Sequence, residues 1–313
     1  MPSEEGGSRH FERLLHLRRL DSIGSLPAAD LALVAEYAHE RFFPGGSVLM
    51  RAGEPVPAIH FLVSGQVRVA RHGRDLGVAR QGAGIGSLAL LAQDPEGVQA
   101  VAQGDALTLE IEADAVQEVF EDRFPILHHV LRDVSRRLAQ AIQRHGPGLF
   151  PDPWQVPLRV PTRTLDLVER LVLLRAAPPF ARASLTTLAD MARAMREVRF
   201  ERGALLWSEG DRAGHTLLVV EGQVRCRSRD GHLDFTFGPG SPVGTLDMVA
   251  EVPRFFEARA ETPLLALQGR VEELIDVLED NHAMAVELLA AITRQLLVLL
   301  ARGHEAPPLE PSP

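Results

Sequence analysis

Apolar and polar residues alternate in short stretches separated by glycine-containing turns, and this pattern occurs twice along the chain. Residues 224–227 alternate Val and Cys with Arg, a period of two that predicts a strand with Cys226 on its buried face. A short helical segment precedes each set of strands, at 28–38 and at 185–195, with Ser184 as the expected N-cap of the second. Short strands at regular turn spacing are typical of a β jelly roll. We therefore expect a mainly β fold with flanking helices (α+β), built of two tandem jelly-roll domains that are each followed by a helix.

After each set of strands the period becomes helical. In the first half one apolar stripe predicts a helix packed on its own domain, and its members are Leu127, Leu131, Val134, Leu138 and Ile142. In the second half residues 284–300, with Asn281 as the expected N-cap, are apolar nearly all round, so more than one surface must cover this helix. We expect a homodimer, formed through Leu289, Ile292, Leu296 and Leu300. The alternative is that the proline-rich segment with Phe150 and Trp154 folds back over this face.

The two halves are also related residue by residue. Phe43 is followed 157 residues later by Phe200 in a similar turn sequence, and the spacing becomes 158 where Gly86 corresponds to Gly244. A repeat of this length indicates two domains rather than a solenoid. The expected organisation is a first domain at 1–146, a proline-rich linker at 147–166, a second domain at 167–303 and a disordered tail at 304–313.

The composition is that of an ordinary globular protein, with 45% hydrophobic and 24% charged residues. The net charge of −9 disfavours direct DNA binding, which needs a basic surface. The single cysteine excludes an internal disulfide, and no signal peptide or membrane span is evident, so we expect a cytoplasmic protein without membrane association. Arginine makes up all 33 basic residues, which we attribute to bacterial high-GC codon usage. No catalytic or metal-binding motif is found, so we expect neither enzyme activity nor a cofactor.

One segment built around a glycine occurs twice along the chain, with different polar and charged side chains in the two copies. It reads GIGSLALLAQDPEGVQAVA at 84–102 and PVGTLDMVAEVPRFFEARA at 242–260. A short helix that opens at the glycine directs backbone N–H groups at an anion, and an arginine can pair with a phosphate through its planar fork. These segments resemble the phosphate-binding cassette of the cyclic nucleotide-binding domain family, which includes the regulatory subunits of cAMP-dependent protein kinase and bacterial catabolite activator proteins. The resemblance covers most of 11–145 and 167–303 and implies a cyclic nucleotide as the ligand.

The resemblance also implies the ligand-binding residues, and both copies depart from the family pattern. These residues are Gly86, Ser87, Leu88, Glu96 and Gln99 in the first copy, and Gly244, Thr245, Leu246, Arg254, Phe255 and Glu257 in the second. The family has a glutamate where this chain has Ser87 and Thr245, and an arginine where it has Glu96. Arg254 keeps the family's arginine, and Glu257 is a candidate to pair with it internally. Phe255 and the following Phe256 replace small residues and are expected to fill the pocket.

Three functions follow from these departures. The favoured one is a non-enzymatic regulatory protein whose two cassettes are degenerate and which acts through an unidentified protein partner. The second is a receptor for cAMP or cGMP that binds the nucleotide through Arg254 in the second domain. The third is a transcription regulator, but the chain has no helix-turn-helix after its last helix, so a partner would have to supply the DNA reader.

Overall fold

The computed structural model describes the chain apart from residues 1–2, 21, 147–163, 178–179, 181–182 and 304–313. Most of the expected linker and the whole expected tail lie outside the described residues. The chain divides into two compact units, Met1–Val130 and Leu131–Pro313, and the division falls inside one helix, α5 (Phe124–His145). Each unit is described by itself below.

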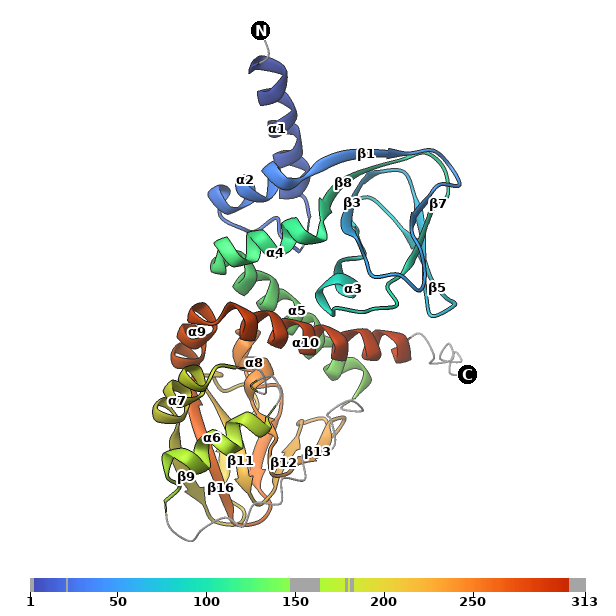
Figure 1. Cartoon of the computed structure of the whole chain (residues 1–313). Coiled ribbons are helices and arrows are strands. Elements are labelled where there is room, and N and C mark those ends of the chain that lie inside the picture. Colours follow the sequence, from blue (N-terminus) through green and yellow to red (C-terminus); the bar gives the residue numbers. More distant parts are fainter. Residues whose placement is uncertain (1–2, 21, 147–163, 178–179, 181–182, 304–313) are drawn as a thin grey trace, which may run out of the picture. The chain divides into compact units, whose positions relative to one another are not determined.

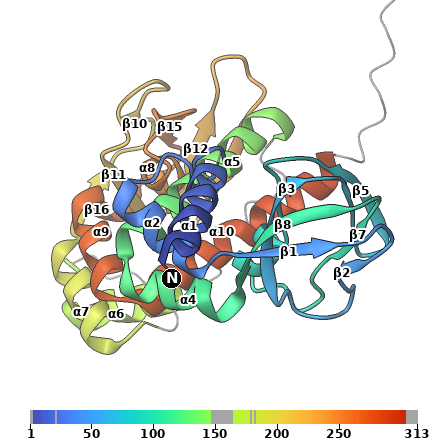
Figure 2. The same cartoon turned by 90° about the horizontal axis from the view of Figure 1, so that it is seen from above.

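The first unit is a barrel of two four-stranded antiparallel sheets, ordered β1-β8-β3-β6 and β2-β7-β4-β5 (Figure 1). The strands are β1 (His39–Phe43), β2 (Val48–Met50), β3 (Ala58–Ser64), β4 (Val67–Arg71), β5 (Arg74–Ala79), β6 (Gly84–Ile85), β7 (Gln99–Ala102) and β8 (Ala106–Glu112). The helices are α1 (Ser3–Arg18), α2 (Ala28–Tyr37), α3 (Ser87–Leu91), α4 (Ala113–Asp122) and the first part of α5. The helices α1, α2 and α4 lie together beside the barrel (Figure 2).

The second unit repeats this order, with sheets β14-β11-β16-β9 and β10-β15-β12-β13. Its strands are β9 (Arg196–Phe200), β10 (Leu205–Trp207), β11 (His215–Glu221), β12 (Val224–Arg227), β13 (Asp234–Phe237), β14 (Pro242–Val243), β15 (Glu257–Ala260) and β16 (Leu264–Arg270). Its helices are α6 (Leu167–Ala176), α7 (Leu185–Ala194), α8 (Thr245–Val249), α9 (Val271–Asp280) and α10 (His282–Gly303). The mainly β architecture of two tandem jelly rolls with flanking helices is therefore confirmed.

The backbone shows where the repeat spacing changes from 157 to 158. Gly82 N donates to Leu62 O in the first unit, and Gly240 N donates to Val219 O in the second, both at 2.8 Å. Leu62 and Val219 are 157 residues apart and the two glycines 158 apart, so the extra residue lies between these strands and the following turn. This register allows each residue of one unit to be compared with its counterpart in the other.

Several local expectations are confirmed, and one is wrong. Ser184 caps α7 by accepting from Thr187 N at 3.0 Å, and Cys226 is fully buried in β12. Asn281 directly precedes α10, but its side chain does not cap that helix. The Asn281 side chain instead accepts from Thr187 Oγ1 and donates to Val277 O, since α7 and α9 pack against each other there.

The predicted stripe of α5 is buried along its whole length, but packing on its own barrel accounts for only part of its contacts. In the first unit, His129 Nε2 lies 3.1 Å from Ser22 O. In the second unit, Arg136 Nε donates to Ala250 O at 2.8 Å, and Arg132 forms an ion pair with Glu251 at 3.0 Å. Ala250 and Glu251 directly follow α8, so the C-terminal half of α5 also contacts the second cassette.

The broad apolar face of α10 is already largely covered in a single chain. Leu289, Ile292 and Leu296 are buried, whereas Val298 and Leu300 are 43% and 37% exposed. The segment His282–Ala301 is long and apolar enough to cross a membrane, and among the described residues it is the one such helix. More than half of it is buried, as in the core helix of a globular domain. The large apolar side chains of α10 that stay exposed therefore lie near its C-terminal end.

Candidate functional site

The first cassette keeps the backbone geometry of a phosphate-binding turn. Gly86 lies before α3 with a φ of 82°, a conformation that favours glycine. A Cβ on Gly86 would stand 2.6 Å from Met50 Cε, so the side chain of Met50 occupies the space beneath the turn. Ser87 uses its hydroxyl to donate to Gly84 O at 2.9 Å, and Leu88 is half-buried in the first turn of α3.

The acidic residue of the first cassette faces solvent. Glu96 has a side chain that is 64% exposed and lies 2.6 Å from Nδ1 of His72, at the turn between β4 and β5. The neighbouring Arg71 donates twice to Asp94 Oδ2, at 2.9 and 2.7 Å. Gln99 is exposed in β7. The Arg71–Asp94 ion pair and the His72–Glu96 contact thus join this hairpin to the cassette loop, and Glu96 places a carboxylate where the family has a cation.

In the second cassette the arginine is turned into the protein. Gly53 N donates to Glu96 O in the first unit as Gly210 N donates to Arg254 O in the second, so Glu96 and Arg254 occupy equivalent positions. The side chain of Arg254 is fully buried, in contrast to Glu96.

Three oxygens bind the guanidinium of Arg254. Its NH1 donates to Gly244 O at 2.8 Å and to Asp247 Oδ2 at 2.9 Å, and its NH2 donates to His215 O. Arg254 Nε and Asp247 Oδ1 are buried without a hydrogen-bond partner among the described residues. The arginine expected to hold a phosphate is therefore engaged by backbone carbonyls and a buried carboxylate.

Aromatic side chains surround this pair. Arg254 Cζ lies 4.0 Å from the ring centroid of Trp207, a cation–π contact. Trp207 Nε1 donates to Phe256 O at 3.1 Å, and the rings of Phe255 and Phe256 meet edge to face at 4.9 Å. Phe255 and Phe256 are buried, as expected of rings that fill the pocket. Phe256 also packs on Phe235, so the cluster reaches β13.

The carboxylate that engages Arg254 is not the expected one. Glu257 pairs instead with Arg259 at 2.5 Å, because both point to the same face of strand β15 two residues apart. Asp247, in the first turn of α8, holds Arg254 and is 1% exposed. Thr245 shares a 2.5 Å contact between its hydroxyl and that of Thr216, and Leu246 is half-buried. The strand period could have identified the Glu257–Arg259 pair, whereas no local signal identified Asp247.

Burial dominates the electrostatics of this region. It raises the pKa of the Asp247 carboxyl, while the guanidinium of Arg254 opposes the rise. Burial also lowers the pKa of His215, and the charge of Arg254 lowers it further. The pKa of the Cys226 thiol is raised well above its ordinary value, first by burial and then by the charge of Asp247. Cys226 is thus a core residue rather than a reactive thiol.

In the described part of the chain, no group of three or more His, Cys, Asp or Glu side chains is arranged to hold a metal ion. What the second cassette offers is a glycine turn and an internally paired arginine. The first offers a glycine turn with an exposed acid.

Comparison with known proteins identifies a curated relative of part of the chain. A CRP-like cAMP-activated global transcriptional regulator from Mycobacterium tuberculosis is 26% identical over 133 residues, which are 41% of this chain and 58% of that protein. The chain thus matches little more than half the length of this curated relative.

Solved structures also align with this chain, and their TM-scores are low. The regulatory subunit of a cAMP-independent protein kinase A from Trypanosoma brucei aligns with a TM-score of 0.34 and 16% identity, covering 98% of this chain and 94% of that chain. The N-terminal domain of a transcriptional regulator from Streptomyces coelicolor A3(2) aligns with a TM-score of 0.32 and 28% identity, covering 42% of this chain and 92% of that chain. The model of the cyclic nucleotide-binding domain matches residues 40–123 and 197–281. With both barrels matched, this chain belongs to the cyclic nucleotide-binding domain family.

Proposed function

We propose that this chain is a non-enzymatic regulatory protein whose two cassettes do not bind a cyclic nucleotide in the family's manner. The observation that carries the proposal is the burial of Arg254, whose two terminal nitrogens donate to Gly244 O, Asp247 Oδ2 and His215 O. The regulated process is reached through a protein partner rather than through direct DNA binding, in keeping with the net charge of −9.

The energetics of the second cassette support this proposal. A phosphate could bind Arg254 in the family's way only if the guanidinium left Asp247. A buried carboxylate without its partner costs about 3–5 kcal/mol, whereas a hydrogen bond to a charged group contributes about 1.5–3 kcal/mol. The exchange is therefore unfavourable unless the nucleotide makes several new contacts, and Phe255 and Phe256 occupy space next to the cassette.

The first cassette supports the proposed lack of nucleotide binding through the charge of Glu96. Glu96 stands where the family has a cation, and its side chain, which contacts His72, is 64% exposed. Like-charge repulsion then opposes the phosphate, while His72 and Arg71 are held by Glu96 and Asp94. The two cassettes thus exclude the nucleotide for separate reasons.

The second candidate function is a receptor for cAMP or cGMP that binds through the second unit. The presence of Arg254 and the hydroxyl of Thr245 in their cassette positions favours it. In this case the nucleotide would have to displace Asp247 from the guanidinium.

Calorimetric titration of the full chain with cAMP and with cGMP distinguishes the two candidates. We expect no heat of binding at nucleotide concentrations in the micromolar range. Micromolar binding that Arg254→Ala abolishes would establish the receptor function. Micromolar binding retained in Arg254→Ala would place the nucleotide in the first unit and contradict the role of Glu96. Asp247→Ala is the matched variant, since it frees Arg254 and should increase any weak affinity.

We extend the proposal to the oligomeric state of the chain. We propose a cytoplasmic homodimer that uses the C-terminal end of α10, where Val298 and Leu300 are exposed, in place of the whole helix. The partly exposed end supports this narrower contact, because Leu289, Ile292 and Leu296 already lie in the interior of one chain.

A further inference from the structure

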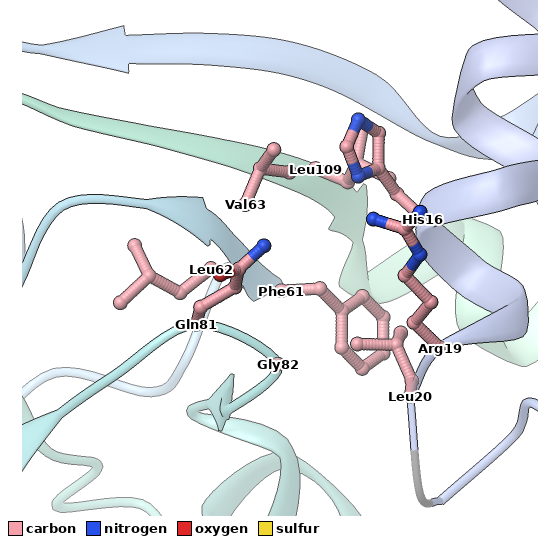
Figure 3. A pocket seen from close by; sticks show the side chains of 9 residues that line it. All are labelled: His16, Arg19, Leu20, Phe61, Leu62, Val63, Gln81, Gly82 and Leu109. Atoms are coloured by element: carbon pink, nitrogen blue, oxygen red, sulfur yellow. The ribbon is translucent and has the colours of Figure 1, made fainter.

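A hollow lies on the first barrel at the end of α1, built from residues outside the cassette (Figure 3). The hollow is shallow: its inner space is about 20 Å³, and the wider volume of about 290 Å³ includes open solvent at its mouth. Its lining comes from the end of α1, from β3, from the turn before β6 and from β8: His16, Arg19, Leu20, Phe61, Leu62, Val63, Gln81, Gly82 and Leu109. A ligand in this hollow would have to be small.

The hollow combines an apolar floor with polar groups above it. Leu20, Phe61 and Leu109 are each less than a tenth exposed and form the floor. His16 and Arg19 approach from the helix, and Gln81 lies across the hollow from them (Figure 3). An arginine fork binds a carboxylate through parallel hydrogen bonds, and an imidazole has a ring N–H to donate whether it is neutral or charged.

The second unit shows that the fold does not need these polar side chains. The segment Phe11–Arg18 reads FERLLHLR, and its counterpart Val168–Arg175 reads VERLVLLR. Across the repeat His16, Arg19 and Gln81 correspond to Leu173, Ala176 and Pro239, whereas Leu20, Phe61 and Leu109 correspond to Ala177, Leu218 and Leu267. The apolar floor is thus common to both units, and the polar groups are present in the first alone.

Other arginines of the same helix have structural roles that recur. Arg13 NH1 donates to Ala38 O at 2.7 Å, as Arg170 NH1 donates to Met195 O at 2.9 Å. Arg18 likewise donates to Leu26 O at 2.8 Å, and its counterpart Arg175 makes the same bond to Ala183 O.

Arg19 differs from both of these arginines. Within the part of the chain that the structure describes, its side chain makes no hydrogen bond or ion pair. A cation after the end of a helix is favoured by the helix dipole, but Arg18 already supplies one there. Neither helix packing nor helix capping therefore explains Arg19 together with His16.

We propose that this hollow binds a small organic carboxylate with an apolar body. The carboxylate bonds to Arg19 and His16, and the apolar body lies on Phe61 and Leu20. Gln81 bonds to the remaining carboxylate oxygen or to a polar substituent. No lining residue belongs to a cassette, but the hollow adjoins the start of the first one, because Phe61 in β3 pairs with Gly84 in β6.

Benzoate is a suitable probe, and the full chain with labelled leucine methyl groups is the sample. We expect benzoate to shift the methyl resonances of Leu20 and Leu109 saturably at low millimolar concentrations. Benzyl alcohol lacks the charge and acetate lacks the apolar body. Each should therefore bind with an affinity at least about tenfold lower than that of benzoate.

The double variant His16→Leu with Arg19→Ala is the decisive one, because it installs the residues that the second unit carries at these positions. It should fold and lose benzoate affinity about tenfold or more, whereas Arg51→Gln, which removes an exposed arginine elsewhere in the same unit, should bind benzoate as the wild type does. Non-saturating shifts at about 10 mM benzoate, or unchanged affinity in the folded double variant, would overturn the proposal.

Discussion

The internal pairing of Arg254 predicts a large and specific loss of stability when that residue is replaced. In Arg254→Met the carboxylate of Asp247, which is 1% exposed, loses its cation, and the carbonyls of Gly244 and His215 lose their donor. Breaking a buried ion pair from one side costs about 3–5 kcal/mol. Methionine fills part of the space under Trp207, so we expect the free energy of unfolding of the second unit to fall by about this amount.

A double-mutant cycle separates the pair from its surroundings. Asp247→Ala leaves the Arg254 guanidinium buried without a carboxylate, and a comparable loss is expected. The double variant Asp247→Ala with Arg254→Met removes both charges and should be more stable than the sum of the single effects by about 2 kcal/mol or more.

Urea unfolding measures these differences if the two units are followed separately, since a chain with two units need not unfold in one step. In a Trp154→Phe background Trp207 is the single tryptophan, and its fluorescence reports on the second unit. The control is Glu257→Ala, which breaks the exposed pair with Arg259 and should change stability by less than about 1 kcal/mol. If Arg254→Met lowers the stability by no more than this control, Arg254 is not held as the structure shows and remains available to a phosphate.

Three further predictions concern other parts of the chain. Burial lowers the pKa of His60, although the charge of Glu110 opposes the shift. The stability that depends on neutral His60 is therefore fully present above the unfolded pKa of about 6.5, and it is lost as the pH falls from there through the lowered pKa of the folded state. Thermal unfolding should accordingly show an acid-dependent loss that His60→Gln diminishes, and an identical pH profile in that variant would contradict it. Arg136→Ala should lower stability by about 1 kcal/mol through loss of the bond to Ala250 O, measured by urea unfolding; no change would show that this contact is not formed. Light scattering should find a dimer that Val298→Glu with Leu300→Glu converts to a monomer, and a wild-type monomer at tens of micromolar would refute the pairing.

The fold and the positions of the cassettes could be predicted from the sequence because they depend on local signals. Glycine turns, strand alternation and the repeat spacing act over a few residues, and they placed Gly86 and Gly244 correctly before short helices. The partner of Arg254 could not be predicted in this way. Asp247 reads as an ordinary acid in a helical first turn, and its burial arises only because the guanidinium folds inward to meet it.

Contacts made across long sequence separations were missed for the same physical reason. The bond from Arg136 to Ala250 O joins residues 114 apart and leaves no periodic trace in either segment. The repeated bonds of Arg13 and Arg170 did leave a trace, since FERLLHLR and VERLVLLR correspond at matching positions. Comparing the two halves against each other could have found those arginines, and it would also have separated them from Arg19.

The two cassette glycines show why a conserved-looking turn does not by itself establish a ligand. Gly86 and Gly244 both adopt a positive φ, and in both a Cβ would collide with a side chain from the barrel interior. Under Gly86 that side chain is Met50, and under Gly244 the guanidinium of Arg254 and the ring of Trp207 fill the space. The positive φ and the internal packing together therefore explain glycine at these positions without a ligand. The residues that bear on nucleotide binding are the ones whose side chains differ between the two units, namely Glu96 on the surface and Arg254 in the interior, and both are engaged by other groups of this chain.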